Sequence, residues 1–430
     1  MRALEWIRNL PRFGRQKPDS SSVWIIPATP AGQYVDQSTA ETYSAVWRCV
    51  RVISSSVAQL PWKVYRKTAR GKREEDAHPV AWLINTQPNP EITAFRFKRQ
   101  MVKDALLWGN GYCEIERDTM GRPLWLWPVE PQRVRVERNE SADIVYRIAS
   151  QGRPEVTIPA ADILHFRGPD DDGLVGTSVI AKAKNSIGLG LAMEQFSATF
   201  FGNGGHVSGA LKHPGKLSKE AKTNLRESFV KAHGGRNSMT PMVLEEGMDY
   251  VRIAVPPEDA QFLGSRQHQV IDICRWFGVP PHKLGDLGRA TWNNIESQSI
   301  DFVTDTIVPW TCNFEEEANI KLFGRQQRGV VYTKFTLAAL LRGDTKSRFD
   351  SYAVGRQWGW LSANDVRALE EMNPIANGNT YLVPANMTTA EKIKEAPAPG
   401  TAEPQPADPE PPEPATPPRN ARLLNKARIP

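Results

Sequence analysis

The pattern of apolar and polar residues predicts a helix, a polar loop and a second helix between Pro257 and Phe323. The first helix carries apolar residues spaced by seven, four and three, which places them on one face: Leu263, Val270, Cys274 and Phe277. It ends at Gly278–Pro281, because two prolines remove backbone donors and push the preceding residues toward extended geometry. Polar residues around a single Trp292 then predict a loop as far as Asn294.

The second helix of this stretch carries apolar residues at spacings of three and four: Ile300, Val303, Ile307, Trp310 and Phe314. Pro309 lies inside this helix and predicts a kink. The loop between the two helices holds no pattern of catalytic residues, so the stretch favours a mechanical role over a chemical one.

Residues 40–175 mix helical and strand periodicity and predict an α+β domain. Helical spacing covers Thr39–Leu60, which Pro61 ends, and about Thr93–Trp108, which Gly109–Gly111 ends. Alternating stretches between turn residues predict short strands at Trp62–Tyr65, Tyr112–Arg117, Leu124–Pro128, Arg133–Glu137, Ile144–Ile148 and Ile163–Phe166.

A long helix is predicted over Gly176–Phe201, followed by a small inserted module at His206–Val255. Gly188 and Gly190 each lower helix stability by roughly 1 kcal/mol relative to alanine, so we expect close packing against a neighbouring segment there. The module contains strands and a basic helix over Ser218–Ala232. Because it lies between two long helices, it is expected to protrude from one end of that pair.

The ordered chain is expected to close with a strand and two helices, at Val330–Phe335, Thr345–Trp358 and Ser362–Glu371. Ser362 is predicted as a helix N-cap, with Asp365 three residues later in the place of the usual capping-box glutamate. In residues 397–418, ten of 22 residues are proline, which predicts an extended, disordered tail.

Composition bounds the class of protein. The chain has 430 residues, enough for two or three compact units, and its 40% hydrophobic and 24% charged residues are typical of a soluble globular protein. No apolar run approaches the roughly 18 residues of a membrane helix, and the basic N-terminus lacks the apolar core of a secretory signal. We therefore expect folding in a reducing cytoplasm. The net charge of +6 permits a nucleic-acid partner without requiring one.

A search for an enzyme site finds no motif that fits its context. Residues 209–217 resemble a phosphate-binding loop but have one residue too many, with Leu217 where a hydroxyl should meet magnesium. Asp170–Asp172 lack the ligand spacing of an EF-hand and are expected to form a solvated turn. Histidines 165, 206 and 213 lack zinc-ligand spacing and are expected to be ordinary surface or interface residues. We expect no metal, no cofactor and no enzymatic activity.

The four cysteines lie far apart in sequence without a C-x-x-C pair, which favours buried free thiols over disulfides or zinc ligands: Cys49, Cys113, Cys274 and Cys312. Basic residues concentrate instead in the inserted module, where they could form a solvated helix face or bind phosphates or an acidic protein surface. These residues are Lys212, Lys216, Lys219, Lys222, Arg226, Lys231 and Arg236.

An ordered series of short segments resembles the portal proteins of tailed double-stranded DNA bacteriophages, of the siphophage type. The segments are Ala45–Val50, Leu60–Pro61, Val64–Tyr65, Pro88–Pro90, Gly109–Tyr112, Ile163–Phe166, Gly176–Ser178, Phe200–Gly205, Asn294–Glu296, Pro309–Trp310, Glu315–Leu322, Leu341–Asp344 and Asn364–Arg367. The resemblance covers residues 40 to 387. Trp47 and Trp310 stand at variable positions, Asp365 replaces a commoner glutamate, and the proline-rich tail lies outside the pattern.

The resemblance implies an α+β portal fold with long stem helices that assembles into a dodecameric ring around a central DNA channel. The implied domains are a flexible basic N-terminal arm (1–27), the wing (28–175), a first stem helix (176–205), the clip (206–256), a second stem helix (257–277), a tunnel loop (278–298), a wing helix and strand (299–340), the crown (341–387) and a disordered tail (388–430).

The same resemblance assigns partners and sites. DNA in transit would meet the tunnel loop at Lys283, Arg289, Trp292 and Asn293. The clip would dock the terminase large subunit and then a head-to-tail adaptor through Lys216, Lys219, Lys222, Arg226, Lys231 and Arg236. Major capsid protein and scaffold are further expected partners, in the virion and, during assembly, in the host cytoplasm.

Two alternatives of other classes remain open at this point. A nucleic-acid-processing enzyme would use the carboxylates of Asp170–Asp172 to bind metal. A peripheral membrane scaffold would use the basic amphipathic arm at Arg2–Lys17, which could equally be a frayed terminus or dock onto a protein. Neither alternative explains two long helices with a module inserted between them.

Overall fold

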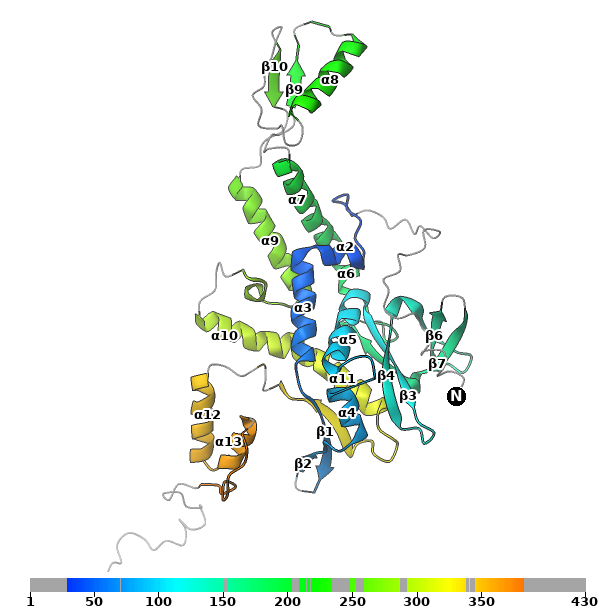
Figure 1. Cartoon of the computed structure of the whole chain (residues 1–430), viewed down its shortest axis with the longest axis vertical. Helices are drawn as coiled ribbons and strands as arrows, with labels where there is room; N and C mark the ends of the chain where they lie inside the picture. The colour runs from blue at the N-terminus through cyan, green and yellow to red at the C-terminus, as the bar shows by residue number, and fades with distance from the viewer. Residues whose placement is uncertain are drawn as a thin grey trace, which may run out of the picture. The chain divides into compact units, whose positions relative to one another are not determined.

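The computed structural model (Figure 1) describes residues 29–382, except for gaps at 70, 151–152, 170, 203–208, 214, 217, 234–247, 253–258, 287–291, 338–339, 341–344 and 371. The chain divides into two compact units, Met1–Gly343 and Asp344–Pro430, which are described separately. Among the described residues, no helix combines the length and apolar character needed to cross a membrane. The predicted N-terminal arm and proline-rich tail lie outside the described residues.

Helices and strands of the first unit follow the expected mixed order. The helical elements are α2 (Gln37–Thr42), α3 (Ser44–Ala58), α4 (Pro79–Asn85), α5 (Ala94–Trp108), α6 (Val179–Lys182), α7 (Lys184–Gly202), α8 (Lys219–His233), α9 (Asp259–Phe277), η4 (Pro281–Leu284), α10 (Trp292–Asp301), η5 (Phe302–Ile307) and α11 (Val308–Lys321). The predicted helix over Thr39–Leu60 is in fact α2 and α3. They are separated because Tyr43 has extended backbone angles, with φ −75° and ψ 119°.

The strands form small antiparallel sheets. Their members are β1 (Trp62–Thr68), β2 (Gly71–Glu74) and β11 (Val331–Phe335) in the first sheet; β3 (Asn110–Arg117), β4 (Pro123–Val129) and β8 (Ile163–Arg167) in the second; β5 (Val134–Arg138), β6 (Ile144–Ser150) and β7 (Arg153–Pro159) in the third; and β9 (Gly209–Lys212) with β10 (Asp249–Arg252). Neither β7 nor α4 was predicted. Polar residues and two prolines obscure the alternation of β7, and α4 is an almost wholly apolar segment of only seven residues, too short to show a helical period. The sheet of β1 and β11 joins residues more than 260 positions apart, with Trp62 opposite Phe335.

The core of the first unit is centred on aromatic side chains of α11 and the first two sheets. The Phe314 ring stacks on Phe166 of β8 with ring centroids 3.9 Å apart, and meets the edge of Trp62 of β1 at 5.8 Å. Trp62 in turn stacks on Phe335 of β11 at 4.9 Å. One helix therefore holds two sheets together through a continuous aromatic contact.

Helices α7 and α9 lie side by side, as Figure 1 shows. The Gln269 side chain of α9 donates to the Ser186 carbonyl of α7 over 2.7 Å. The expected close packing at the two glycines of α7 is confirmed. A Cβ on Gly188 would lie 2.4 Å from Oγ1 of Thr29, and one on Gly190 would lie 2.7 Å from the Tyr43 ring.

Pro309 produces a different feature from the plain kink that its position predicts. The π-helical turns of η5 end at Ile307, and α11 begins at Val308, so Pro309 falls in the first turn of α11. Because α10, η5 and α11 run on without a break, the N–H that Pro309 lacks leaves a carbonyl of η5 without its helical partner, and the π-helical turns accommodate that mismatch. A π-helical insertion at this point is typical of a functional or strained segment.

The second unit contains α12 (Thr345–Gln357) and α13 (Ala363–Leu369). The predicted cap of α13 is confirmed. Ser362 Oγ accepts from the Asp365 N–H at 3.1 Å, and the Asp365 carboxylate accepts from the Ser362 N–H at 2.8 Å. Arg348 and Tyr352 of α12 both bond to Glu370, each over 2.8 Å, which ties the two helices together.

The packing at Gly190 gives a testable contrast with Gly264 of α9, around which nothing lies within 4 Å. Both substitutions to alanine should gain up to about 1 kcal/mol of helix propensity. In Gly190→Ala this gain is outweighed by overpacking against Tyr43, costing roughly 1–3 kcal/mol. Denaturant unfolding should therefore show Gly190→Ala less stable and Gly264→Ala more stable than the parent. Equal shifts in the two variants would contradict this packing argument.

Candidate functional site

The segment between α9 and α10 is fixed at its base by two contacts. Gly278 ends α9 with φ +64°, and its carbonyl accepts from Thr306 Oγ1 over 2.6 Å. Further along, the His282 ring of η4 lies 3.0 Å from the Gln298 side-chain oxygen of α10. These two contacts connect the chain before residues 287–291 with the chain after them.

Lys283 lies in η4, at the base of this loop. Its carbonyl accepts from the Arg48 guanidinium of α3 over 3.1 Å, and its ammonium lies 6.0 Å from the Phe302 ring centroid. α3 therefore supports the loop from one side. This role of Arg48 was not predicted from the sequence, since 235 residues separate the two positions.

The other predicted loop residues are placed differently. Trp292 and Asn293 begin helix α10, so the loop is shorter at its end than the prediction of a loop through Asn294. Helix α10 starts earlier than predicted because it is the first part of a longer helical run, in which α10, η5 and α11 follow one another without a break. Arg289 lies outside the described residues.

The basic residues of the inserted module are partly described. Lys216, Lys219 and Lys222 are exposed, and α8 starts at Lys219 as predicted within one residue. Arg226 and Lys231 lie on α8, where only their backbone is described, and Arg236 lies outside the described residues. Lys219, Lys222 and Arg226 are spaced by three and four, so they share one face of the helix.

The segments that resembled catalytic motifs have structural roles. Gly209–Lys212 form strand β9, which pairs with β10 instead of forming a phosphate loop. The carboxylate of Asp172 accepts from the backbone N–H groups of Leu174 and Val175, as expected of a turn. In the part of the chain that the structure describes, no group of three or more His, Cys, Asp or Glu side chains could hold a metal ion.

The cysteines are free thiols. Cys49, Cys113 and Cys274 are buried, but Cys312 is exposed, so the expectation of burial is wrong for that residue. It lies on α11 away from the aromatic contacts of Phe314. A hydrogen bond to Cys274 together with burial raises the pKa of the Cys49 thiol, so this thiol stays protonated between α3 and α9.

The segment between α5 and β3 and the segment before α6 meet at two glycines whose backbones touch. A Cβ on Gly109 would lie 2.3 Å from the Gly176 carbonyl oxygen, and one on Gly176 would lie 2.1 Å from that of Gly109. Between them, the Asn110 amide donates to the Gly176 carbonyl at 3.0 Å and accepts from its N–H at 2.7 Å. Only glycine fits either position, which explains two of the sequence signatures as packing features.

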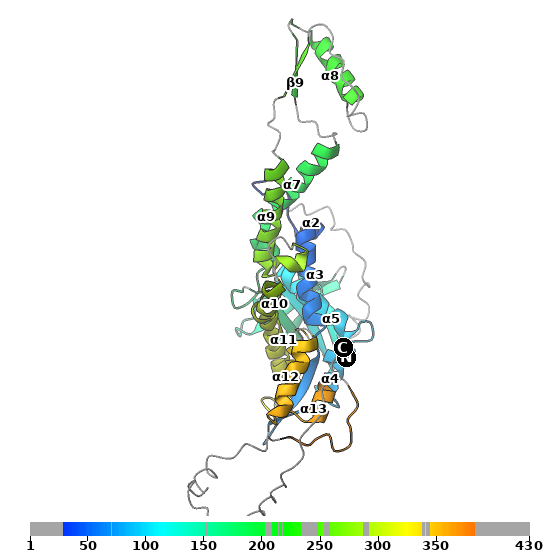
Figure 2. The same cartoon turned by 90° about the vertical axis from the view of Figure 1, so that its left-hand side faces the viewer.

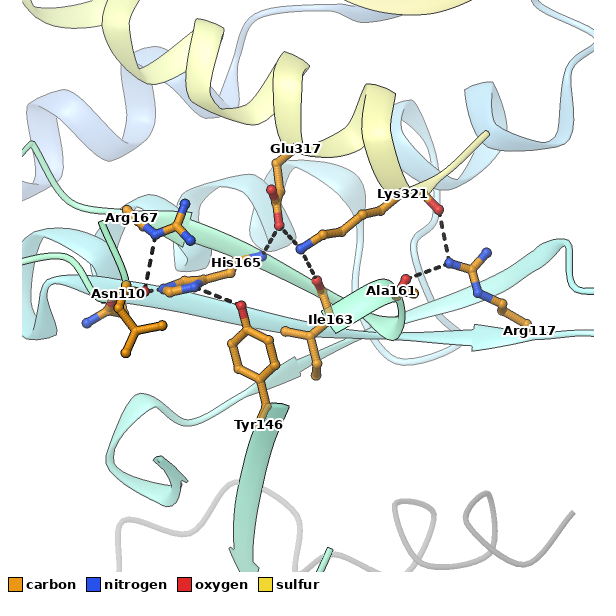
Figure 3. A network of polar contacts seen from close by, with 10 residues as sticks. Asn110, Arg117, Tyr146, Ala161, Ile163, His165, Arg167, Glu317 and Lys321 are labelled. Carbon is orange, nitrogen blue, oxygen red and sulfur yellow. Dashed lines mark hydrogen bonds and ion pairs between the residues drawn. The ribbon is translucent and has the colours of Figure 1, made fainter. Parts of the chain in front are cut away.

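His165 connects this junction to the third sheet, as Figure 3 shows. Its Nε2 lies 2.8 Å from the Asn110 side-chain oxygen, and its Nδ1 lies 3.0 Å from the Tyr146 hydroxyl. His165 is only 1% exposed, and burial lowers its pKa to about 3. The prediction of an ordinary surface or interface histidine was wrong, because the ring is neutral and buried between two sheets.

Helix α11 is attached to the same strand by a pair of charged residues. Glu317 accepts from the His165 backbone N–H at 2.8 Å and pairs with Lys321, which donates to the Ile163 carbonyl at 2.7 Å (Figure 3). At the end of α11, Arg117 of β3 donates to the Lys321 carbonyl at 3.0 Å. This network positions the helix; it offers no exposed nucleophile or general base.

Comparison with known proteins decides the family. A family model described as phage portal protein matches residues 44–371. The chain is a member of the phage portal protein family. It is 31% identical over 344 residues to the portal protein of Enterobacteria phage HK97, covering 79% of this chain and 81% of that protein.

Two further relatives agree. The probable portal protein of Streptomyces phage phiC31 is 32% identical over 411 residues, covering 89% of this chain and 86% of that one. A chain in the neck of an empty gene transfer agent particle, computed with C6 symmetry, superposes with a TM-score of 0.55 at 25% identity, covering 77% of this chain and 90% of that one. The portal family accounts for the mixed helix and sheet architecture and for a role in DNA packaging through a capsid vertex.

In a protein of the portal family, the buried network stabilises the fold. Its pH response is testable through His165. Below the unfolded pKa of 6.5 of this residue, the unfolded chain binds a proton that the folded chain does not bind until about pH 3. The unfolding free energy should therefore fall as pH falls from 6.5 to 3, by an amount on the order of 4 kcal/mol.

His165→Gln keeps a donor for Asn110 but cannot titrate, so this variant should lose that part of the pH dependence in denaturant unfolding. Burial also raises the pKa of Asp104 and of Glu114 to about 7, which acts in the opposite direction over the same range. The pH dependence of the unfolding free energy is therefore compared between variants and not read from the parent alone. His268→Gln, at an exposed position, is the matched control, and an unchanged pH slope in His165→Gln would refute the prediction.

Proposed function

We propose that this portal protein assembles into a ring of twelve subunits, with the wing, stem, clip and crown divided as the family resemblance implies. Residues 278–298 would face DNA as the tunnel loop, and residues 206–256 would form the clip. The relative in a neck computed with C6 symmetry supports a ring, because twelve subunits are compatible with sixfold averaging. The ring would be part of the virion and would assemble in the host cytoplasm, where major capsid protein and scaffold are expected to bind it.

The observation that carries the DNA-contact proposal is the fixed base of the loop. The bonds at Gly278 and His282 hold both of its ends, so residues 287–291 are presented from a firm support. A channel must not retain its cargo, and each phosphate neutralised adds salt-sensitive affinity. Lys283, Arg289, Trp292 and Asn293 supply only two cations, which suits transient contact with DNA.

The loop proposal is tested by replacing residues 287–291 with glycine and serine while leaving η4 and α10 intact. Rings should form normally in electron-microscopic class averages, because the anchoring bonds remain. The length of packaged DNA, or its retention after packaging, should fall. Arg325→Ser, which removes one exposed charge elsewhere, is the control. Normal packaging and infectivity in the loop variant would rule out the DNA-contact role.

The clip is proposed as the docking site for the terminase large subunit and later for the head-to-tail adaptor. Its support is the exposure of Lys216, Lys219 and Lys222, which suits an acidic partner surface. Arg226, Lys231 and Arg236 are proposed to extend that surface. We further propose that the docked motor supplies the energy, and that this chain has no ATPase activity of its own.

Reversal of Lys219 and Lys222 to glutamate should weaken binding of purified terminase large subunit at least tenfold, because attraction becomes repulsion. The effect should shrink at high salt, where exposed charges are screened. Lys72→Glu with Arg73→Glu, on strand β2, is the matched control. The same affinity in the clip variant as in this control would exclude the helix face as the docking site.

A further inference from the structure

Two sides of the first unit carry opposite charge. Figure 2 shows α3 and α5 on one side of the unit and α10 and α11 on the other. The exposed charged residues of α3 and α5 on the first side are arginines: Arg48, Arg51, Arg96 and Arg99. On the second side, the exposed residues of α10, η5 and α11 include the acids Asp301, Asp305 and Glu316.

Within the described part of the chain, no ion pair involves any of the four arginines or the three acids. The Arg48 guanidinium also donates to the Lys283 carbonyl, which is neutral and leaves its charge unpaired. Glu41, an acid beside the arginine side, is instead paired with Lys103 over 2.7 Å. Lys334 is an exposed cation that lies, like Glu316, near Cys312. Each side therefore retains a net charge of one sign that a partner can complement.

Exposed apolar side chains accompany the charges on both sides. Trp47 of α3 is 46% exposed and Phe95 of α5 is 43% exposed, and the Arg51 guanidinium lies 4.9 Å from the Trp47 ring centroid. On the acidic side, Ile300 is 49% and Ile320 is 56% exposed. Aromatic side chains and arginine are the residues that most often anchor protein interfaces.

A recess of about 380 Å³ also lies beside Asp305. It is lined in part by Trp276, Pro309 and Trp310, and its charged lining residues are Asp305 and Arg167. The acidic side thus offers a hollow for an apolar side chain with one carboxylate at its edge. The arginine side offers projecting aromatic rings with cations beside them.

We propose that the arginine side of one copy, at Arg48, Arg51, Arg96 and Arg99, packs against the acidic side of the next copy, at Asp301, Asp305 and Glu316. This contact rests on the proposed ring and names the surfaces that form it. A twofold contact would place like charges together, whereas a head-to-tail contact pairs opposite charges. Head-to-tail contacts repeated around a closed circle generate a ring with an axial opening.

Charge exchange tests this arrangement. Arg48→Glu with Arg51→Glu makes the first side acidic, and Asp301→Lys with Asp305→Lys makes the second side basic. Each double variant alone should lose at least nine-tenths of its rings in mass photometry and electron microscopy. An equal mixture should regain them in strict alternation, because the two altered sides are opposite in charge and so are the two unaltered sides.

The restored rings should contain equal numbers of both variants, read by mass-tagging one of them. Circular dichroism melting of each variant alone excludes simple misfolding. Arg135→Glu with Arg138→Glu on β5, outside both sides, should form rings normally.

The outcomes separate this contact from the function on which it rests. Rings formed by the parent and by each double variant alone would overturn the proposed contact while leaving the proposed ring intact. Variants that stay without rings when mixed would also overturn it. A parent protein that forms no rings would remove both the contact and the proposed function.

Discussion

The contact of two backbones at Gly109 and Gly176 is the constraint on which the second sheet and helix α7 both depend. A side chain at either position would overlap the other segment by more than an ångström. Because the contact sits where α5 passes into β3, and just before α6 and α7, it fixes where α7 leaves the sheet. Asn110 satisfies both polar groups of Gly176, so this close approach leaves no buried backbone group without a partner there.

Helix α11 extends that constraint through the rest of the unit. Its Phe314 ring joins two sheets, while Glu317 and Lys321 attach it to strand β8. The π-helical turns of η5 lie directly before it, and Thr306 within them holds the end of α9. The loop that faces DNA in our proposal is thus supported by the same continuous helix that packs the core of the first unit. A conduit under load benefits from such a continuous connection.

In our two proposals, different charged groups serve the contact between subunits and the contact with DNA. The loop region brings few cations, which limits the affinity for DNA phosphates. Opposite charges lie instead on the two sides of the first unit, where a neighbouring copy would use them. Exposed ion pairs contribute little energy individually, so their main effect would be to orient subunits while Trp47 and the other apolar side chains supply most of the stabilisation.

The sequence by itself determined the elements that depend on interactions between residues close together in the chain. Ser362 and Asp365 cap α13 because their partners are three residues away, and helical spacing placed α9 to within one residue. The ordered signatures also identified the family. Only the tertiary structure decided the rest: that His165 is buried and neutral, that Cys312 is exposed, that Tyr43 divides a helix, and that Arg48 meets Lys283. Each depends on segments far apart in the chain, and a linear pattern does not record which of them touch.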